Sequence, residues 1–488
     1  MLNVPEINWT VLGPQLLVLA TGVVVLIADL AVSRRKGGAL GNLPAALGLA
    51  GVLFVLVFQF QFWGKGPLTT MAGMVVLDDF ALFFNLILLA AAAISILVAW
   101  NYLRVEQIQS GEYYVLLLFA VFGMMVMAAT TSLLMIFLGL EIMSVAVYVM
   151  AGLLTRQAKS NESALKYFLL GAFSTGFLLY GIAGLYLATG SLDVAEIAKA
   201  PLRGNLFAVV GMGLLLVGFG FKIASVPFHM WTPDVYEGAP TSVTGFMAVA
   251  VKAAAFAAFL RVFVLGFGQL KWEWVFVVYW LAVLTMTYGN VVALVQKNIK
   301  RMLAYSSIAH AGYLLVAMAA IGRTPAQGAG AVMYYLLVYT FMNLGAFAVV
   351  AYLAKKDEQQ YDIEGYGGLA YRHPLAALAL AVFLFSLAGI PPFAGFIGKF
   401  YIFSAAISAH MYYLAIIGVL NSALSVYYYI RVVYLMYAKE PVADGPMAGF
   451  SAAGGAAILV SAVAVVALGI FPSRLLDLAG QAVGMLLK

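Results

Sequence analysis

The stretch SLAGIPPFAGFIGKFYIF, residues 386–403, lies inside a longer apolar run at 375–409 that decides how this chain folds. A run of that length exceeds what one straight helix needs to cross a bilayer. It also contains Gly389, Pro391, Pro392, Gly395 and Gly398. Proline removes a backbone donor and clashes with the preceding turn of a helix. The run therefore predicts a membrane helix that is broken at mid-depth, with Lys399 shortly after the break.

The composition places the rest of the chain in a bilayer as well. Of its 488 residues, 65% are hydrophobic and 9% are charged, and the mean hydropathy is +1.02. In a soluble domain about a quarter of the residues are charged. Cysteine is absent, which excludes disulfides, Cys-ligated zinc, iron–sulfur clusters and thiol catalysis. We expect an all-α polytopic membrane protein whose electron transfer, if any, takes place on another chain.

About fourteen apolar segments are long enough to cross a hydrocarbon core of roughly 30 Å. They lie near 11–32, 42–63, 80–103, 113–130, 132–154, 165–189, 205–230, 241–267, 273–296, 302–321, 329–354, 375–409, 413–438 and 452–471. The proline in Ser225-Val226-Pro227 predicts a second broken helix, in the seventh span. Broken spans are tolerated where the freed backbone is buried in protein or faces water.

The two broken spans, the seventh and the twelfth, predict an internal repeat, because they lie five spans apart. A repeat unit with an odd number of spans gives two halves of inverted topology, with the ion path at mid-membrane. We divide the chain into three peripheral helices at 1–112, a first five-helix repeat at 113–270, a second at 271–440, and the last helix with a C-terminal tail at 441–488.

The basic residues of the loops predict the orientation. Loops after odd-numbered spans carry Arg34, Arg35, Lys36, Arg104, Arg156, Lys159, Lys297, Lys300, Arg301, Lys355, Lys356, Arg372 and Lys439. Loops after even-numbered spans carry only Lys65, Lys199, Arg203, Lys271 and Arg323. Positive loops stay in the cytoplasm, so we expect both termini on the opposite, periplasmic side. The scattered charges do not form the single basic face that nucleic-acid binding requires.

Four ionisable residues fall in the middle of apolar spans: Glu141, Lys222, Lys252 and Lys399. Such a group costs a few kcal/mol or more at membrane depth and is kept mainly for function. Their chemistry suggests a path for protons, whereas a purely structural role would leave transport unchanged when they are neutralised. If Glu141 and Lys222 touch, movement of the carboxylate would change whether the lysine holds its proton.

The positions of Lys222 and Lys399 relative to the breaks suggest different tasks. Lys222 precedes Pro227 and so lies near the C-terminal end of a half-helix, where the helix dipole favours a positive charge. Lys399 follows the other break, near the start of a half-helix, where the dipole would favour proton release. We therefore hypothesise that Lys222 loads protons and Lys399 discharges them.

Several further polar residues have two interpretations. Ser306 and His310 share a helix face and could relay protons between Lys252 and Lys399, or His310 could be a satisfied core histidine. His229 could serve the path or simply end its helix. Asp234 and Glu237 could guide protons at the cytoplasmic mouth or belong to an ordinary turn. Residues near span ends are expected to snorkel or to lie at the interface; these are Lys166, Arg261, Arg431, His373 and His410.

Three stretches together closely resemble the antiporter-like membrane subunits of respiratory complex I and the related Mrp-type antiporters. They are FKIASVPFHMWTPDVYEGAPTSVTGFMAVAVKAAAF (221–256), QKNIKRMLAYSSIAHAGYL (296–314) and SLAGIPPFAGFIGKFYIF (386–403). Within the family, the last stretch and the chain length are most similar to N-type subunits of bacterial NADH:quinone oxidoreductase. By match of motif, Glu141, Lys222, Lys252 and Lys399 correspond to the family's acid of the fifth helix and its lysines of the seventh, eighth and twelfth helices.

The resemblance implies a proton-translocating subunit in the bacterial inner membrane, driven by redox chemistry on partner subunits. It implies no cofactor or metal on this chain, with NADH, FMN, iron–sulfur clusters and quinone on the partners. The sequence also has no nucleotide-binding or HExxH motif. The alternatives are a subunit of an Mrp-type Na⁺/H⁺ antiporter or of a membrane-bound hydrogenase, a free-standing secondary transporter for an organic solute, and a purely structural subunit.

Overall fold

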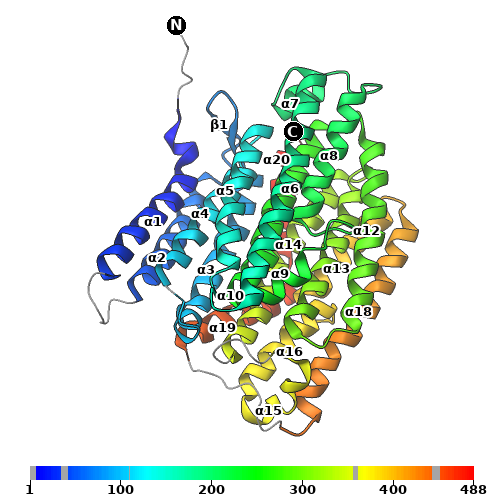
Figure 1. Cartoon of the computed structure of the whole chain (residues 1–488). Coiled ribbons are helices and arrows are strands. Elements are labelled where there is room, and N and C mark those ends of the chain that lie inside the picture. Colours follow the sequence, from blue (N-terminus) through cyan, green and yellow to red (C-terminus); the bar gives the residue numbers. More distant parts are fainter. Residues whose placement is uncertain (1–6, 34–41, 109, 355–360, 442–450, 488) are drawn as a thin grey trace.

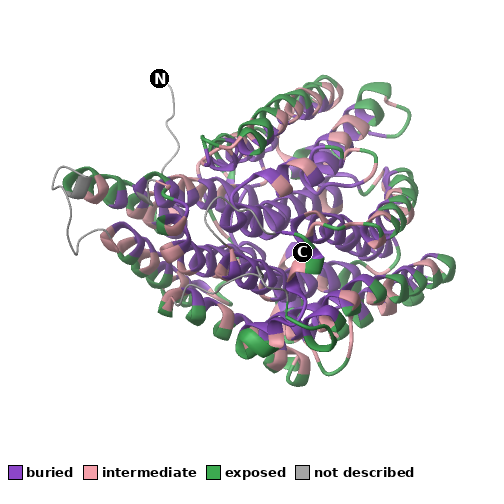
Figure 2. Cartoon of the chain, turned by 60° about the horizontal axis from the view of Figure 1, so that its bottom comes forward, coloured by how far each residue is buried: buried purple, intermediate pink, exposed green. Residues whose placement is uncertain are grey.

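The computed structural model describes residues 7–33, 42–108, 110–354, 361–441 and 451–487. The loop residues Arg34, Arg35, Lys36, Lys355 and Lys356, which contributed to the predicted orientation, lie outside the described residues. Within the described part, the chain folds into a bundle of long helices (Figure 1), whose centre is buried and whose outer helices expose one face (Figure 2).

Twelve helical segments of the described chain are long and apolar enough to cross a membrane. They are α1 (Trp9–Ser33), α2 (Leu43–Phe58) with the short η2 (Gln59–Phe62), α3 (Asp79–Val105), α4 (Ser110–Ala128), α5 (Leu133–Ala151), α6 (Ala158–Thr189), the continuous α10 (Thr241–Phe246), η3 (Met247–Val251) and α11 (Lys252–Gly266), α12 (Lys271–Leu294), α13 (Ile299–Ala320), α14 (Pro325–Leu353), α18 (Tyr412–Ala438) and α19 (Ala452–Ile470).

Two further spans are broken, as the sequence predicts. One consists of α8 (Leu206–Lys222) and the short α9 (Thr232–Gly238), and the other of α16 (Pro374–Ala388) and α17 (Ala394–Ser408). With the twelve unbroken segments, they account for the fourteen predicted spans. The multi-pass all-α fold is therefore confirmed.

The backbone at the first break is hydrogen-bonded within the protein. The indole Nε1 of Trp231 donates to the carbonyl of Phe221 at 3.1 Å, and the amide of Ser225 donates to the carbonyl of Gly220 at 2.8 Å. The amide of Val226 donates to Thr285 Oγ1 at 3.0 Å. These bonds replace the helical ones that the break removes, as a bilayer requires.

The second break depends on a glycine in the left-handed region. Gly389 has φ +85° and caps the C-terminus of α16, where its amide donates to the carbonyls of Phe385 and Ser386. A Cβ at this position would lie 2.9 Å from Cδ of Lys399. Gly389 therefore provides both the sharp turn and the space for the lysine side chain.

The described helices contain two similar units that run in opposite directions. In the first unit, the chain before α5 pairs with the chain before α7 (Val194–Lys199), with Leu133 N to Leu192 O and Val194 N to Thr131 O both 2.9 Å. In the second, the chain before α13 pairs with that before η5 (Ile363–Tyr366), with Ile299 N to Tyr361 O and Ile363 N to Lys297 O both 2.8 Å. The first pairing lies at the α7 end of the bundle and the second at the end with α15 (Leu369–Arg372) (Figure 1).

Glycines bring corresponding helix pairs close together in the two units. A Cβ on Gly123 of α4 would lie 2.5 Å from the carbonyl oxygen of Gly139 of α5. A Cβ on Gly289 of α12 would lie 2.7 Å from the amide of Ala309 of α13. Small residues let membrane helices approach backbone to backbone, so the same kind of contact fixes each pair.

A hairpin and a C-terminal helix are among the elements that were not predicted. A short hairpin of β1 (Leu68–Thr70) and β2 (Val75–Leu77) links α2 to α3, and the C-terminal tail forms an amphipathic helix, α20 (Ser473–Leu486). α20 packs against α3 and α14. The carboxamide Oε1 of Gln481 accepts a hydrogen bond from Trp63 Nε1 at 3.4 Å. The tail is therefore part of the bundle.

The expected snorkelling of Arg261 is wrong. Its guanidinium forms a bidentate ion pair with Asp78, with distances of 2.8 and 2.9 Å, and the two side chains are only 3% and 5% exposed. It also donates to the carbonyl of Ala128 at 3.1 Å. Asp78 additionally caps α3 by accepting from the amide of Ala81. The sequence placed Arg261 near a span end but could not show the distant acid that buries it.

We expect Asp78→Ala to destabilise the protein by about 3–5 kcal/mol, because removal of one partner leaves the other charge buried and unpaired. Thermal unfolding of the detergent-purified protein measures the change. The double substitution Asp78→Leu with Arg261→Met should recover most of the loss, since neither charge remains. A double variant as unstable as Asp78→Ala would contradict this explanation.

Candidate functional site

Lys222 is the last residue of α8 and is buried at the first break. Its Nζ donates to Ser144 Oγ at 2.8 Å and to Tyr148 Oη at 3.2 Å, both on α5. The ring centroid of Tyr148 lies 5.3 Å from the amine, and that of Tyr167 lies 5.8 Å away. Hydroxyls and aromatic faces therefore surround this amine, which lies at the negative end of the α8 dipole.

Glu141 does not form an ion pair with Lys222 in this structure. Its carboxylate accepts a hydrogen bond from Thr175 Oγ1 of α6 at 2.9 Å. It lies three residues before Ser144 on α5, so it shares a helix face with the serine that accepts from Lys222. The carboxylate is thus one helical turn from the partner of Lys222.

Lys252 lies directly after a π-helical segment, η3, which interrupts the α-helix from Thr241 to Gly266. Its amine donates to the carbonyl of Ser307 at 2.6 Å and also to the Ser307 hydroxyl. It is 2% exposed. π-helical turns often mark functional sites, and this one turns the lysine toward α13.

A chain of hydroxyls and one imidazole continues from that point. The Ser306 hydroxyl, next to Ser307 on α13, hydrogen-bonds with Tyr429 Oη of α18. Tyr429 Oη lies 3.1 Å from His310 Nε2, and His310 Nδ1 hydrogen-bonds with Tyr335 Oη of α14. Serine, tyrosine and histidine can each both donate and accept a proton. Tyr429 thus lies between Ser306 and His310.

Lys399 is buried in the second break, and its amine contacts a helix C-terminus. Nζ donates to the carbonyl of Ala388, the last residue of α16, at 3.0 Å, and to Ser422 Oγ of α18 at 3.0 Å. It lies 5.0 Å from the ring centroid of Tyr313, whose ring is 5.6 Å from that of His310. The aromatic ring of Tyr313 therefore contacts both the amine of Lys399 and the ring of His310.

This geometry corrects the dipole hypothesis for Lys399. Although the residue belongs to α17, its side chain points back toward the preceding half-helix, as helical side chains do. Its amine therefore meets the negative end of the α16 dipole, just as Lys222 lies at the negative end of the α8 dipole. The dipoles do not distinguish a loading lysine from a discharging one.

A groove of about 600 Å³ opens beside Lys399 between α17 and α18. Phe400 and Val419 line it and are largely exposed on the surface of the chain. The groove leads from the buried amine to the outer face of the bundle, and an amine at this depth is costly next to lipid.

His229 lies between the two halves of the first broken span and is not joined to this chain. Its ring packs edge-on against Tyr288 with centroids 4.6 Å apart. Within the described residues, its Nδ1 is buried and has no hydrogen-bond partner. The structure gives each of the three lysines, Glu141 and His310 a hydroxyl partner, and among the described residues it leaves Nδ1 of His229 without one.

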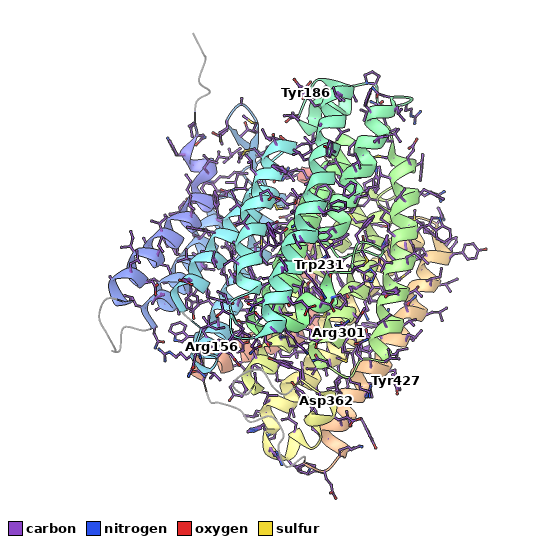
Figure 3. All side chains as sticks on the ribbon, in the orientation of Figure 1. Arg156, Tyr186, Trp231, Arg301, Asp362 and Tyr427 are labelled. Atoms are coloured by element: carbon purple, nitrogen blue, oxygen red, sulfur yellow. The ribbon has the colours of Figure 1, made fainter. Side chains whose placement is uncertain are left out.

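A charge cluster lies where α6, α9 and α13 meet, which we call the α9 cluster: Lys159, Lys166, Asp234, Glu237 and Arg301. Asp234 pairs with Lys166 at 2.7 Å and with Arg301 at 2.8 Å, and Glu237 pairs with Lys159 at 2.8 Å and with Arg301 at 3.0 Å. Lys166 therefore does not simply snorkel. Arg301 lies nearer than Trp231 to the end of the bundle that carries Asp362 (Figure 3).

The cluster keeps its acids ionised. Partial burial alone would raise the pKa of Asp234, but hydrogen bonds from Lys166 and Arg301 outweigh it and hold the pKa below its ordinary value. The pKa of Glu237 is lowered in the same way by Lys159 and Arg301, against the effect of burial. Two acids held ionised in this way are poorly suited to accepting protons near neutral pH, and the three basic side chains of the cluster balance their charge.

Sequence reasoning missed the hydroxyl partners of the lysines. Ser144 and Tyr148 lie three and seven residues after Glu141, on one helix face, so helical spacing could have identified them. Ser307, Ser422, Tyr335 and Tyr429 gave no such signal, because serine and tyrosine are common in packed membrane helices. Among the described residues, no group of three or more His, Asp or Glu side chains is arranged to bind a metal ion.

Residues 130–425 match the family described as "NADH:quinone oxidoreductase/Mrp antiporter, TM". The chain belongs to this family. It is 48% identical over 484 residues to "NADH-quinone oxidoreductase subunit N" of Trichlorobacter lovleyi, covering 98% of each chain. It is 43% identical to "NADH-quinone oxidoreductase subunit N 1" of Herpetosiphon aurantiacus, covering 97% of this chain and 96% of the relative.

Solved structures also resemble this chain over nearly its whole length. A chain of respiratory complex I from Thermus thermophilus with bound aureothin superposes with a TM-score of 0.82 at 36% identity, covering 96% of this chain and 99% of that one. A chain of the Mrp complex from Dietzia sp. shares the fold, with a TM-score of 0.81 at 22% identity and coverage of 98% and 97%. Chains of this antiporter-like family are thus found in multi-subunit membrane complexes.

The α9 cluster yields a prediction about pH. Because the pKa of Asp234 is lowered in the folded state, its pairing stabilises the protein above the unfolded pKa, and this contribution is lost only as pH falls through the lowered folded value. Infrared difference spectra of wild type and Asp234→Asn should show no protonated-carboxyl band from Asp234 between about pH 5 and 8. A titration midpoint inside that window would mean that Asp234 exchanges protons itself.

Proposed function

We propose that this chain is the N-type, proton-translocating membrane subunit of a bacterial NADH:quinone oxidoreductase. The observation that supports this most is the set of buried amines at and between the two broken spans, each of which donates to a hydroxyl. Lys222 and Lys399 lie at the two breaks, and Lys252 and His310 lie between them. Ionisable groups inside a membrane bundle mark ion pathways.

The proton path would use the two repeats as two half-sites. In the first, Glu141 biases Lys222 through α5, on which both the acid and the hydroxyl partners of Lys222 are located. Lys252 passes its proton to the hydroxyls of α13, and Tyr429 and His310 carry it toward Lys399.

Redox chemistry would drive this movement from partner subunits. NADH, FMN, iron–sulfur clusters and quinone would bind to those subunits, and this chain would contribute to a translocase without carrying out electron transfer itself. The groove beside Lys399 supports a neighbouring membrane subunit, because a covering helix would replace lipid next to the amine. The α15 end would face the cytoplasm and both termini the periplasm, across the inner membrane.

The Mrp-type alternative shares this fold, so the fold does not distinguish it from the complex I assignment. Na⁺/H⁺ exchange by the assembled complex without NADH or quinone would favour it, as would a gene neighbourhood without NADH-oxidising subunits. Solute transport by the purified chain alone would favour a free-standing transporter.

Replacement of the buried lysines should uncouple or stop proton pumping. In sealed vesicles containing the assembled complex, we expect Lys222→Ala, Lys252→Ala and Lys399→Ala each to lower NADH-driven proton pumping several-fold, because each removes a proton-carrying amine. Quinone-dependent NADH oxidation is measured in parallel to give the number of protons per electron.

Lys199→Ala is the matched control, since Lys199 is exposed on α7 and pairs only with the nearby Glu196 among the described residues. It should pump like wild type. If each of the three single variants assembles and pumps an unchanged number of protons per electron, these lysines are structural and the proposed function is refuted.

A further inference from the structure

A groove of about 470 Å³ lies at the α7 end of the bundle, between the start of α12, the α13–α14 connection and the α17–α18 connection. We call it the aromatic groove. Its lining includes Trp272, Phe276, Trp280 and Tyr413, together with Arg323 and His410. Its lining includes none of Lys222, Lys252 and Lys399 and no residue of the α9 cluster.

The groove lies where spans end. α12 begins at Lys271, α17 ends at Ser408 and α18 begins at Tyr412. Its apolar side chains are not covered by the chain itself, since Tyr413 is 79% and Phe276 65% exposed. Tryptophan and tyrosine concentrate at the level where lipid headgroups meet the hydrocarbon core. The groove therefore opens toward lipid at the depth of the headgroups.

Two cations lie near the same indole at the edge of the groove, Arg323 in its lining and Lys271 beside Trp272. Lys271 Nζ lies 4.9 Å from the Trp272 ring centroid, and Arg323 Cζ lies 5.8 Å from it. Arg323 also donates to the carbonyl of Ala409 at 3.2 Å, which fixes its position on the α17–α18 connection. Cation–π contacts of this kind hold a guanidinium and an ammonium near each other.

Neither cation is neutralised by an acid in the described part of the chain, where the salt bridges involve other basic residues. The nearest acid in sequence is Glu273, which is exposed and does not line the groove. His410 faces the same groove and hydrogen-bonds through Nδ1 with Tyr412 Oη at 2.9 Å. The border of the groove therefore carries positive charge that no acid of the described residues pairs with.

We propose that the aromatic groove binds one anionic phospholipid. Its phosphate would pair with Lys271 and Arg323 beside the Trp272 indole, and an acyl chain would follow Phe276 and Trp280 along α12. Basic pockets between membrane helices recognise anionic headgroups. A partner protein's helix fits less well, because it needs a continuous apolar face, and here the apolar lining ends at two cations. The site is separate from the proposed proton path.

The experiment uses the assembled complex, delipidated in mild detergent and incubated with vesicles containing a photoreactive phosphatidylglycerol or the matching phosphatidylcholine. Peptide mapping locates the crosslinks. We expect phosphatidylglycerol to label peptides that contain residues 272–280 or 410–413, and phosphatidylcholine to label them far less. An excess of inorganic phosphate should not compete, because it lacks an acyl chain.

The double substitution Lys271→Gln with Arg323→Gln should lower this labelling by more than about tenfold, since each basic residue near an anionic headgroup contributes about a fivefold effect. The control, Lys199→Gln with Arg203→Gln, removes the same charge at the same end of the bundle and should label like wild type. Trp280→Ala should weaken labelling while the cations remain.

Three outcomes would overturn the proposal: equal labelling by the two lipids, undiminished labelling in the double variant, or loss of a partner subunit from the double variant's complex. The last would identify the groove as a protein interface. Measurement of subunit composition alongside the crosslinks separates a lost lipid site from failed assembly.

Discussion

Every backbone N–H and C=O inside a bilayer needs a partner within the protein, and the two broken helices are where this chain meets that requirement with side chains. At the first break Trp231 and Thr285 supply the missing bonds. At the second, the amine of Lys399 donates to the last carbonyl of α16. A helix C-terminus at mid-depth is electrostatically negative, so each break is also a place where a buried ammonium is stabilised.

The two repeats each hold a buried amine at a helix break, but they do so with different residues. Lys222 precedes its break and donates to hydroxyls on α5, whereas Lys399 follows its break and reaches back to it. The half-sites are therefore similar in electrostatics but not in sequence, which explains why a residue-level match between the halves is not evident. Between them, the π-helical turn before Lys252 directs its amine to Ser307 on the fully buried α13.

Hydropathy and proline placement were enough to predict the fourteen spans and both breaks, because span length and backbone chemistry in a bilayer are tightly constrained. Lys222, Lys252 and Lys399 could be chosen from depth alone, whereas the buried Lys300 was expected in a loop. What sequence could not supply were contacts between distant helices: Asp78 with Arg261, Tyr429 with His310, and Lys399 with the end of α16. Each joins residues whose pairing depends on how the helices pack.

One oxygen atom allows the most direct test of the proposed proton path. Tyr429 Oη is the described atom that joins the Ser306 hydroxyl to the imidazole of His310, so Tyr429→Phe removes the link and keeps the ring. The measurement is the number of protons pumped per electron by the assembled complex in sealed vesicles. A proton path through Tyr429 predicts a lower ratio in a complex that assembles and oxidises NADH. An unchanged ratio would contradict a proton path through these side chains.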